Sequence, residues 1–577
     1  MVMVVGRRGA DHVRSGWPRL DVVVIGVVVA AVALLALVPL CFLLWQSVRA
    51  GGIGAAAGFT FDHYLRVYGS LETLRTFVTS LQFAAGSAGL AFLVGTAAAW
   101  IVERTNTPLR ALFPVLVLVP LIVPGILFTI AWIFLASPKI GWINLILRSL
   151  LGTADTYVDA YTLPGMIWVE GLHYSPMAFA LMSAAFKAMD PSLEEAAMMG
   201  GAGALRTTWR ITLRLARPAI VATLLILFLR AVESFEVPAL LGLPVGIQVF
   251  SASIYQAINQ FPSQVGTAST YSVTLLLIAS LGLWLQSRAT GSARRYATVT
   301  GKAFRPRPLD LGGWRFVTLA FLILYTLLIV ALPLLVLVWA SFQNYYAIPS
   351  LAGLRNLTLD PYRFILAYPG LGDAVLNSLF LAVASATIVM LLTAVVCWIV
   401  VKTKMPGRWL LDNLASLPMV FPGVVLGLSL MMLFLNVDVG IYGTIWILLI
   451  AYVARFMPYG LRYNTVSMIQ IHKELEDSAA MCGASWIDSF RRIVLPLLKP
   501  GFVAGWIYIM IVSVRELSSS ILLYSRGTEV VSIVVWELWE NGQFVELSAL
   551  SVLFILGLVG LVAVASLIGR RFGIKEV

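Results

Sequence analysis

Twelve long apolar runs constrain the fold of this chain more than any other feature of its sequence. A helix needs roughly 20 apolar residues to cross about 30 Å of hydrocarbon. The runs lie at about 22–45, 80–101, 112–135, 163–186, 216–232, 268–286, 316–340, 376–401, 411–435, 443–461, 500–514 and 546–568. We therefore predict an all-α polytopic membrane protein of about twelve transmembrane helices.

The composition agrees with this class. Of the 577 residues, 60% are hydrophobic and only 12% are charged, which lies outside the range of soluble domains. The net charge of +12 could suit a nucleic-acid binder, but the sequence has no basic helix with interleaved aromatic residues, so we predict no nucleic-acid partner. Cys41, Cys397 and Cys482 are far apart, which favours small core residues over a disulfide framework or a metal site.

Positive charge predicts the orientation of the helices. Most of the 40 Lys and Arg residues fall in segments that face the cytoplasm if the N-terminus is cytoplasmic, and cytoplasmic loops of membrane proteins carry such an excess. We therefore predict that both termini are cytoplasmic. The first run is too long for a cleaved signal peptide and has no small-residue cleavage site, so we predict that it is retained.

An internal repeat divides the chain into two halves. The stretch VPLIVPG at 119–125 matches LPMVFPG at 417–423. Farther on, Glu194, Gly201, Arg210, Ile211, Leu213 and Pro218 match Glu476, Gly483, Arg492, Ile493, Leu495 and Pro500. We predict two parallel six-helix halves, 1–286 and 316–577, joined by a basic cytoplasmic linker at 287–315. An insertion in the first half, WINLILRSLLG at 142–152, predicts an amphipathic helix on the outer surface.

A charged, glycine-rich segment follows the fourth run of each half. In the first copy, Asp190 suits a helix N-cap, and Glu194 and Glu195 suit the first turn of that helix. Gly200 and Gly201 would end it. We predict a short helix that seats in a groove of a cytoplasmic partner. A connector that serves only topology is the alternative, and the recurrence of the segment in both halves disfavours it.

These segments resemble the signature loop of permease subunits of binding-protein-dependent ABC importers. The family pattern is Glu-Ala-Ala, three residues, Gly, nine residues, Ile, one residue and Leu-Pro. The first copy reads Glu195, Ala196, Ala197, Gly201, Ile211 and Leu213, with Arg214 in place of the proline. The second reads Asp477, Ser478, Ala479, Gly483, Ile493, Leu495 and Pro496. Over its full length the chain is similar to fused ferric iron permeases, with thiamine and aminoethylphosphonate permeases as relatives.

The resemblance implies a type I ABC importer transmembrane-domain fold and a division of labour. Loops at about 190–204 and 473–486 would form coupling helices that dock on two copies of an ATP-binding subunit. The implied docking residues are Glu194, Glu195, Ala196, Ala197, Gly201, Glu476, Asp477, Ala479 and Gly483. An extracytoplasmic binding protein would deliver substrate, and the chain would lie in the bacterial inner membrane.

We predict no catalytic residue and no cofactor in this chain. Its nearest glycine-lysine pair, Gly301-Lys302, has Tyr296 where a phosphate-binding loop needs its leading glycine and Ala303 where it needs Ser or Thr. ATP and Mg would therefore be bound by the partner ATPase subunits.

Charged residues at membrane depth indicate a candidate substrate pathway, because ionisable groups in membranes are costly and usually functional. They are Arg230, Glu233 and Glu236 in the first half, and Arg515 and Glu516 in the second. Carboxylates suit a hard cation such as ferric iron, and the arginines could meet a chelating anion. Structural ion pairs, Arg230 with Glu233 and Arg515 with Glu516 or a partner across the bundle, are the alternative. The sequence shows no cluster of metal ligands, so metal ligands are left unassigned.

Two further features of the sequence bear on function. Pro120, Pro124, Gly125, Pro418, Pro422 and Gly423 are predicted to interrupt the third helix of each half, either as gating kinks or as static ones. His173 and Tyr174 align with Arg455 and Phe456, and we interpret this position as a packing feature.

The sequence thus predicts the permease subunit of an ATP-driven importer. Ferric iron is the first substrate hypothesis, and thiamine and aminoethylphosphonate are the alternatives. A twelve-helix secondary carrier is the second class, with Glu233, Glu236 or Glu516 as its coupling site. The paired loops disfavour it, because such a carrier has no partner in which they could seat.

Overall fold

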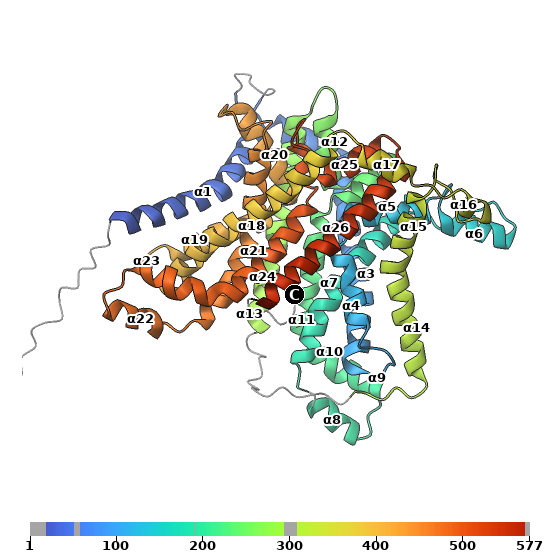
Figure 1. Cartoon of the computed structure of the whole chain (residues 1–577), viewed down its shortest axis with the longest axis horizontal. Coiled ribbons are helices and arrows are strands. Elements are labelled where there is room, and N and C mark those ends of the chain that lie inside the picture. The colour runs from blue at the N-terminus through green and yellow to red at the C-terminus, as the bar shows by residue number, and fades with distance from the viewer. Residues whose placement is uncertain (1–18, 51–57, 191, 294–307, 572–577) are drawn as a thin grey trace, which may run out of the picture.

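The computed structural model describes residues 19–50, 58–190, 192–293 and 308–571. Within these ranges the chain is helical, apart from two isolated β-bridges and the connecting loops (Figure 1). Eight helices are long and apolar enough to cross a membrane, and four bent helix pairs bring the total to as many as twelve. The predicted all-α polytopic class is confirmed.

The helices of the first half follow the predicted runs. In chain order they are α1 (Arg19–Ser47), α2 (Asp62–Tyr68), α3 (Leu71–Arg104), α4 (Phe113–Leu118), η1 (Val119–Leu121), α5 (Gly125–Ala136), α6 (Trp142–Leu151), α7 (Leu163–Ala188), α8 (Ser192–Met199), α9 (Ala204–Thr207), η2 (Thr208–Thr212), α10 (Leu213–Leu215), α11 (Arg217–Glu233), η3 (Pro238–Gly242), η4 (Leu243–Val245), α12 (Phe250–Asn259) and α13 (Val265–Ala293).

The second half follows a similar order, with the short helix α16 added after α15 and no helix that matches α6. Its elements are α14 (Trp314–Thr326), η6 (Leu327–Ala331), α15 (Leu332–Ser341), α16 (Leu351–Arg355), α17 (Asp360–Leu366), α18 (Leu371–Lys402), α19 (Arg408–Ser416), η7 (Leu417–Val420), α20 (Gly423–Asn436), α21 (Ile445–Gln470), α22 (Glu474–Met481), α23 (Trp486–Ser489), η8 (Phe490–Val494), α24 (Leu495–Val514), η9 (Ser520–Leu522), α25 (Val531–Glu540) and α26 (Phe544–Arg571).

Two details of the predicted spans are corrected. The short runs at 216–232 and 500–514 belong to longer helical segments, a pair bent by 67° at 208–233 and a helix of 28 residues, Ile487–Val514. An additional apolar pair, Pro238–Val245 and Phe250–Asn259, bends by 70° and was not predicted. Its Ser, Gln and Gly residues dilute the apolar run, so periodicity alone did not reveal it.

The first helix of each half packs on the other half. On α1, Ile25 and Val32 are buried in one cluster with Cys397 and Trp398 of α18. On α14, the hydroxyl of Tyr325 lies 2.8 Å from that of Ser175 on α7. Figure 1 shows α1 beside α19 and α20, and α14 beside α3 and α4. The two halves therefore exchange their first helices.

The end of the predicted linker is anchored to the first half. The backbone of Leu309 pairs with that of Thr105, and the amide of Asn106 donates to Asp310 at 2.6 Å. The helix α13 continues into the predicted linker as far as Ala293. The linker residues 294–307, which include Gly301 and Lys302, lie outside the described residues.

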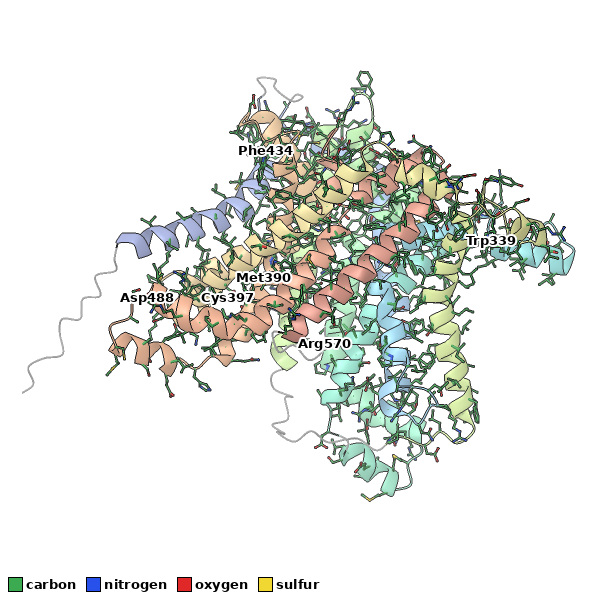
Figure 2. The ribbon with its side chains drawn as sticks, in the orientation of Figure 1. Trp339, Met390, Cys397, Phe434, Asp488 and Arg570 are labelled. Atoms are coloured by element: carbon green, nitrogen blue, oxygen red, sulfur yellow. The ribbon has the colours of Figure 1, made fainter. Side chains whose placement is uncertain are left out.

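The cysteines correct a second expectation. Cys397 on α18 is buried, and its thiol donates to the carbonyl of Leu461 at 3.3 Å. Figure 2 labels it on the same helix as Met390. Cys41 and Cys482 are exposed, so they are not the core residues that we predicted.

Candidate functional site

The two predicted docking segments have the same geometry. Each contains a helix of eight residues, α8 and α22, which ends at a glycine with φ of 82°, Gly201 and Gly483. The next amide, of Ala202 or Ala484, donates to the carbonyl five residues back at 3.0 Å. This is a Schellman ending, and its left-handed residue favours glycine. Figure 1 places α8 and α22 at separate corners of the molecule.

Both helices present apolar side chains to the surroundings. Leu193 and Met199 of α8 are 52% and 85% exposed, and Leu475 and Met481 of α22 are 46% and 89% exposed. Glu195 of α8 and Asp477 of α22 are exposed as well. We call the exposed residues of α8 and α22 the docking surfaces. Exposed apolar patches with a polar rim are typical of protein interaction sites.

Glu194 does not belong to its docking surface. It is 4% exposed, and its carboxylate lies 3.2 Å from the guanidinium of Arg104, the last residue of α3. The hydroxyl of Thr212 also donates to Glu194, at 2.5 Å. The carboxylate of Glu194 therefore links α8 to the end of α3.

Glu476 holds the equivalent position in the second half. Its carboxylate lies 3.4 Å from the ammonium of Lys402, the last residue of α18, and accepts from the indole N–H of Trp398 at 2.9 Å. Glu194 and Glu476 were grouped with the docking residues from sequence. Both carboxylates lie beside a basic residue at the end of a membrane helix, and their part in docking stays a prediction.

The third helix of each half is broken where the prolines predict. The segments on either side of the break meet at 102° between Phe113–Leu121 and Gly125–Ala136, and at 104° between Arg408–Val420 and Gly423–Asn436. Pro124 and Pro422 are the N-caps of the second segments. Whether the breaks move during transport stays a prediction.

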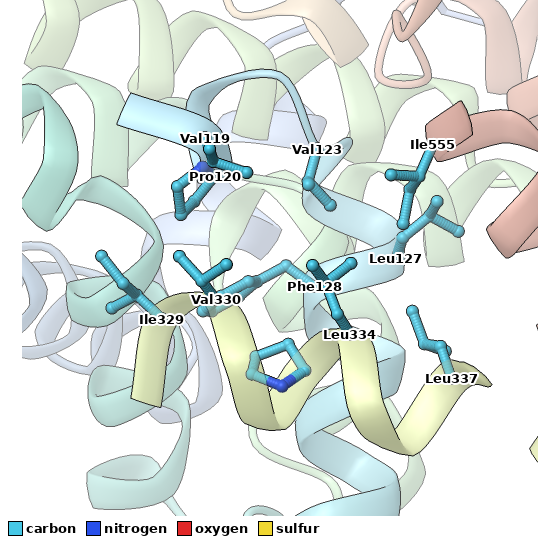
Figure 3. Close-up of a pocket in the computed structure, with 11 residues that line it drawn as sticks. Val119, Pro120, Val123, Leu127, Phe128, Ile329, Val330, Leu334, Leu337 and Ile555 are labelled. Carbon is cyan, nitrogen blue, oxygen red and sulfur yellow. The ribbon is translucent and has the colours of Figure 1, made fainter. Parts of the chain in front are cut away.

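A narrow apolar cavity borders the first break. Figure 3 shows it between Val119, Pro120 and Val123 on one side and Ile329 and Val330 of the second half on the other. Its volume is about 10 Å³, which is near the minimum for one water molecule. The cavity is too small and too apolar for a charged substrate.

The predicted pathway residues meet at the interface between the halves. The guanidinium of Arg230 lies 3.4 Å from the carboxylate of Glu233 and also donates to the hydroxyl of Tyr459 on α21. The guanidinium of Arg515 donates to the carbonyl of Leu121, at the first helix break. Arg230 and Arg515 therefore each reach from one half into the other.

Glu516 pairs with a residue that sequence reasoning assigned to packing. Its carboxylate lies 3.1 Å from Nε of Arg455 and accepts from the amide and hydroxyl of Ser519 at 3.0 and 3.1 Å. Arg230 and Glu233 form the ion pair that the alternative expects. Glu516 pairs with Arg455 of the neighbouring helix α21 in its own half, and Arg515 donates to a carbonyl. A role of these residues in the substrate pathway stays a prediction.

Three acidic or imidazole groups lie near the first break. A Cβ added to Gly125 would be 3.4 Å from Nε2 of His173 and 3.6 Å from the carboxyl carbon of Glu236. Glu170, one turn before His173 on α7, is 1% exposed and interacts electrostatically with Glu236. Sequence reasoning missed Glu170, although a Glu inside an apolar run is itself a signal.

Metal ligands do not converge here as in a resident metal centre. Among the described residues, no group of three or more His, Cys, Asp or Glu side chains is placed to hold a metal ion. Any ion at this centre would therefore meet fewer protein ligands than a closed structural site provides.

Comparison with known proteins identifies one family. The family described as "Binding-protein-dependent transport system inner membrane component" matches residues 91–291 and 401–573. The two matched segments contain both docking surfaces and both sets of charged residues.

Several curated proteins resemble the chain. The ferric transport system permease protein FbpB of Actinobacillus pleuropneumoniae is 25% identical over 492 residues, 84% of this chain and 70% of that protein. The putative ferric transport system permease protein FbpB 1 of Haemophilus influenzae is 27% identical over 463 residues, 79% of this chain and 71% of that protein. A putative 2-aminoethylphosphonate transport system permease protein, PhnV of Salmonella typhi, is 26% identical over 220 residues, 37% of this chain and 79% of that protein.

A solved structure of a bacterial ABC transporter involved in the import of alginate is 21% identical, with a TM-score of 0.38. It covers 48% of this chain and 96% of that chain.

Proposed function

Because the chain belongs to the family of binding-protein-dependent transport system inner membrane components, we propose that it is the permease subunit of an ATP-driven ferric iron importer. The paired docking surfaces carry the proposal. Two eight-residue helices with the same Schellman ending, each tied by an inward carboxylate to a membrane helix, suit the transmission of movement from two identical partners.

Two copies of an ATP-binding subunit are the proposed occupants of these surfaces. ATP and Mg would be bound by those subunits, and this chain would bind neither. The docking surfaces would then face the cytoplasm, with both termini of the chain on the same side. This orientation agrees with the distribution of Lys and Arg in the sequence.

An extracytoplasmic binding protein would deliver the substrate at the opposite end. Ferric iron is proposed because three relatives that match 79–84% of this chain are named for ferric or Fe(3+) transport. The phosphonate relative matches only 37% of the chain. Buried carboxylates at the interface between the halves suit a hard cation. A secondary carrier is disfavoured, because it offers no use for two docking surfaces.

Substrate-stimulated ATP hydrolysis tests this proposal. The chain, its ATPase and its binding protein would be reconstituted in liposomes, and the binding protein would be loaded with iron or left empty. We expect stimulation by the iron-loaded form. Stimulation by an aminoalkylphosphonate or by thiamine, and not by iron, would keep the importer and reject iron as its substrate.

A further inference from the structure

Arg104, the last residue of α3, holds the docking helix α8 and the end of α7 in place. Its guanidinium lies 3.2 Å from the carboxylate of Glu194 on α8 and donates to the carbonyl of Met189, the C-cap of α7, at 3.4 Å. The side chains of Arg104 and Glu194 are only 2% and 6% exposed. A charge buried to this extent is costly without its partner, so the pair fixes the position of α8 relative to two membrane helices.

Lys402, the last residue of α18, forms the same contacts in the second half. Its ammonium lies 3.4 Å from the carboxylate of Glu476 on α22 and donates to the carbonyl of Ile471, the C-cap of α21. The two side chains of the ion pair are 6% and 13% exposed. We call each set of a base, a carboxylate and a carbonyl a clamp. Each clamp joins a docking helix to two membrane helices.

The clamps occupy equivalent positions of the internal repeat. The corresponding positions are Arg104 and Lys402, Met189 and Ile471, and Glu194 and Glu476. The insertion that contains α6 lies between α3 and α8 in the first half, and the same contacts form in the half that has no such helix. The clamp is therefore a feature of how each half is built, and it accepts either an arginine or a lysine.

The clamp is the main hold on each docking helix. All residues of α8 are described, and Glu194 is the one that is buried. On α22, Glu476 is partly buried, whereas Leu475 and Asp477 on either side of it are exposed. A helix with so little other burial passes a displacement to the membrane helices mainly through its clamp.

Each carboxylate also accepts from a neutral donor, and the donor differs between the halves. The hydroxyl of Thr212 donates to Glu194 at 2.5 Å, whereas the indole N–H of Trp398 donates to Glu476 at 2.9 Å. Trp100 is the equivalent of Trp398, and its buried indole N–H has no hydrogen-bond partner among the described residues. Hydrogen bonds to a charged group are stronger than neutral ones, so each carboxylate is fixed by a base and by a second donor.

We propose that Arg104 and Lys402 are positioning residues, through which movement of a docked ATP-binding subunit reaches the membrane helices. This inference rests on the proposed function. Both bases are buried in ion pairs, whereas the docking surfaces consist of exposed residues such as Glu195 and Asp477. Docking affinity and transmission therefore depend on different residues. Without a clamp the ATP-binding subunit still binds and hydrolyses ATP, but less of that hydrolysis moves substrate.

Variants that remove one charge test the clamps. Glu194→Gln and Glu476→Gln keep the size of the side chain and remove its charge. Arg104→Lys and Lys402→Arg are the conservative variants, since each introduces the base that the other half already uses. Glu194→Asp and Glu476→Asp keep the charge and shorten the side chain, and they replace any Gln variant that thermal denaturation shows to be unfolded.

The matched control is Glu103→Gln, next to Arg104 on α3. Glu103 lies 3.3 Å from the ammonium of Lys187, whose side chain is 66% exposed, and this ion pair holds no docking helix. The affinity of the solubilised permease for the ATP-binding subunit is measured for every variant. Substrate transported per ATP hydrolysed is measured in liposomes with the substrate that stimulates the wild-type protein, which is iron in the proposed function.

We expect each Gln variant to lower the transport per ATP by a factor of about five or more, a typical size for coupling between two sites. Its affinity for the ATP-binding subunit should stay close to that of the wild type. The conservative variants and Glu103→Gln should keep both quantities.

Two results would overturn the inference. A loss of affinity in parallel with transport would make the two glutamates docking residues, and an unchanged transport per ATP in folded Gln or Asp variants would show that the clamps transmit nothing. Wild-type protein that binds no ATP-binding subunit would instead reject the proposed function itself.

Discussion

The guanidinium of Arg104 lies 3.2 Å from the carboxylate of Glu194, and the two side chains are only 2% and 6% exposed. Arg104 also donates to the carbonyls of Phe186, at 2.8 Å, and Met189, at 3.4 Å, where α7 ends. One arginine therefore joins α3, α7 and α8. A displacement of α8 by a docked partner would reach two membrane helices through this contact.

Removal of the acid should destabilise the permease. Glu194→Ala leaves the guanidinium of Arg104 buried without its partner, so we expect a loss of about 3 kcal/mol in the free energy of unfolding. The control is Lys187→Ala, because the Lys187 side chain is 66% exposed and its ammonium lies 3.3 Å from Glu103. That change should cost less than about 1 kcal/mol. Denaturation of both purified variants measures the difference in the free energy of unfolding. Equal losses in the two variants would contradict a stabilising role of the buried Arg104–Glu194 ion pair.

A side chain at either glycine that ends a docking helix should strain the backbone there. Gly201 and Gly483 each have φ of 82°, where an L-residue costs about 1–2 kcal/mol. We expect Gly201→Ala and Gly483→Ala to weaken ATPase stimulation by the loaded binding protein. Gly203→Ala is the control, since a Cβ there meets nothing within 4 Å and its φ is ordinary. Full stimulation in the double variant would show that the helix ending is not needed for coupling.

Charge reversal on the docking surfaces should release the ATPase without unfolding the permease. Glu195 and Asp477 are exposed, and exposed substitutions usually change stability by less than about 0.5 kcal/mol. We expect Glu195→Lys with Asp477→Lys to lower the affinity for the ATPase at least tenfold, measured by surface-immobilised binding. Asp360→Lys, on α17 at the opposite end, should leave the affinity unchanged. A similar loss in all variants would point to a general electrostatic effect.

The two helix breaks should differ in their tolerance of a methyl group. In Gly423→Ala the new Cβ would meet the Cβ of Ser518 at 2.7 Å and disturb Arg455, whereas in Gly125→Ala the nearest atom is Nε2 of His173 at 3.4 Å. Overpacking of this kind costs about 1–3 kcal/mol. Thermal denaturation should therefore show a larger loss for Gly423→Ala. The reverse order would contradict the close approach of Arg455 to the second break.

Much of the fold could be predicted from local sequence. Apolar runs located the membrane helices, and the prolines and glycines in VPLIVPG and LPMVFPG located the two breaks, because both signals depend on a few neighbouring residues. The docking helices were placed within a few residues, since their acids and terminal glycines mark the start and end of a helix.

Contacts between distant residues could not be predicted. The exchange of α1 and α14 between the halves leaves no signal in helices that are apolar on most sides, because such helices fit lipid and protein alike. The sequence placed Glu194 and Glu195 on one helix but did not show that one faces inward. The pairing of Arg455 with Glu516 depends on the packing of α21 against α24, which local sequence does not encode.

The most direct test of the account is the composition of the intact complex, measured by native mass spectrometry of the solubilised importer. We predict one copy of this 62.9 kDa chain with two copies of an ATP-binding subunit. When Glu195→Lys alters α8, we predict that only one copy of the ATP-binding subunit remains bound. A chain that carries no ATPase and accumulates substrate from an ion gradient alone would contradict it.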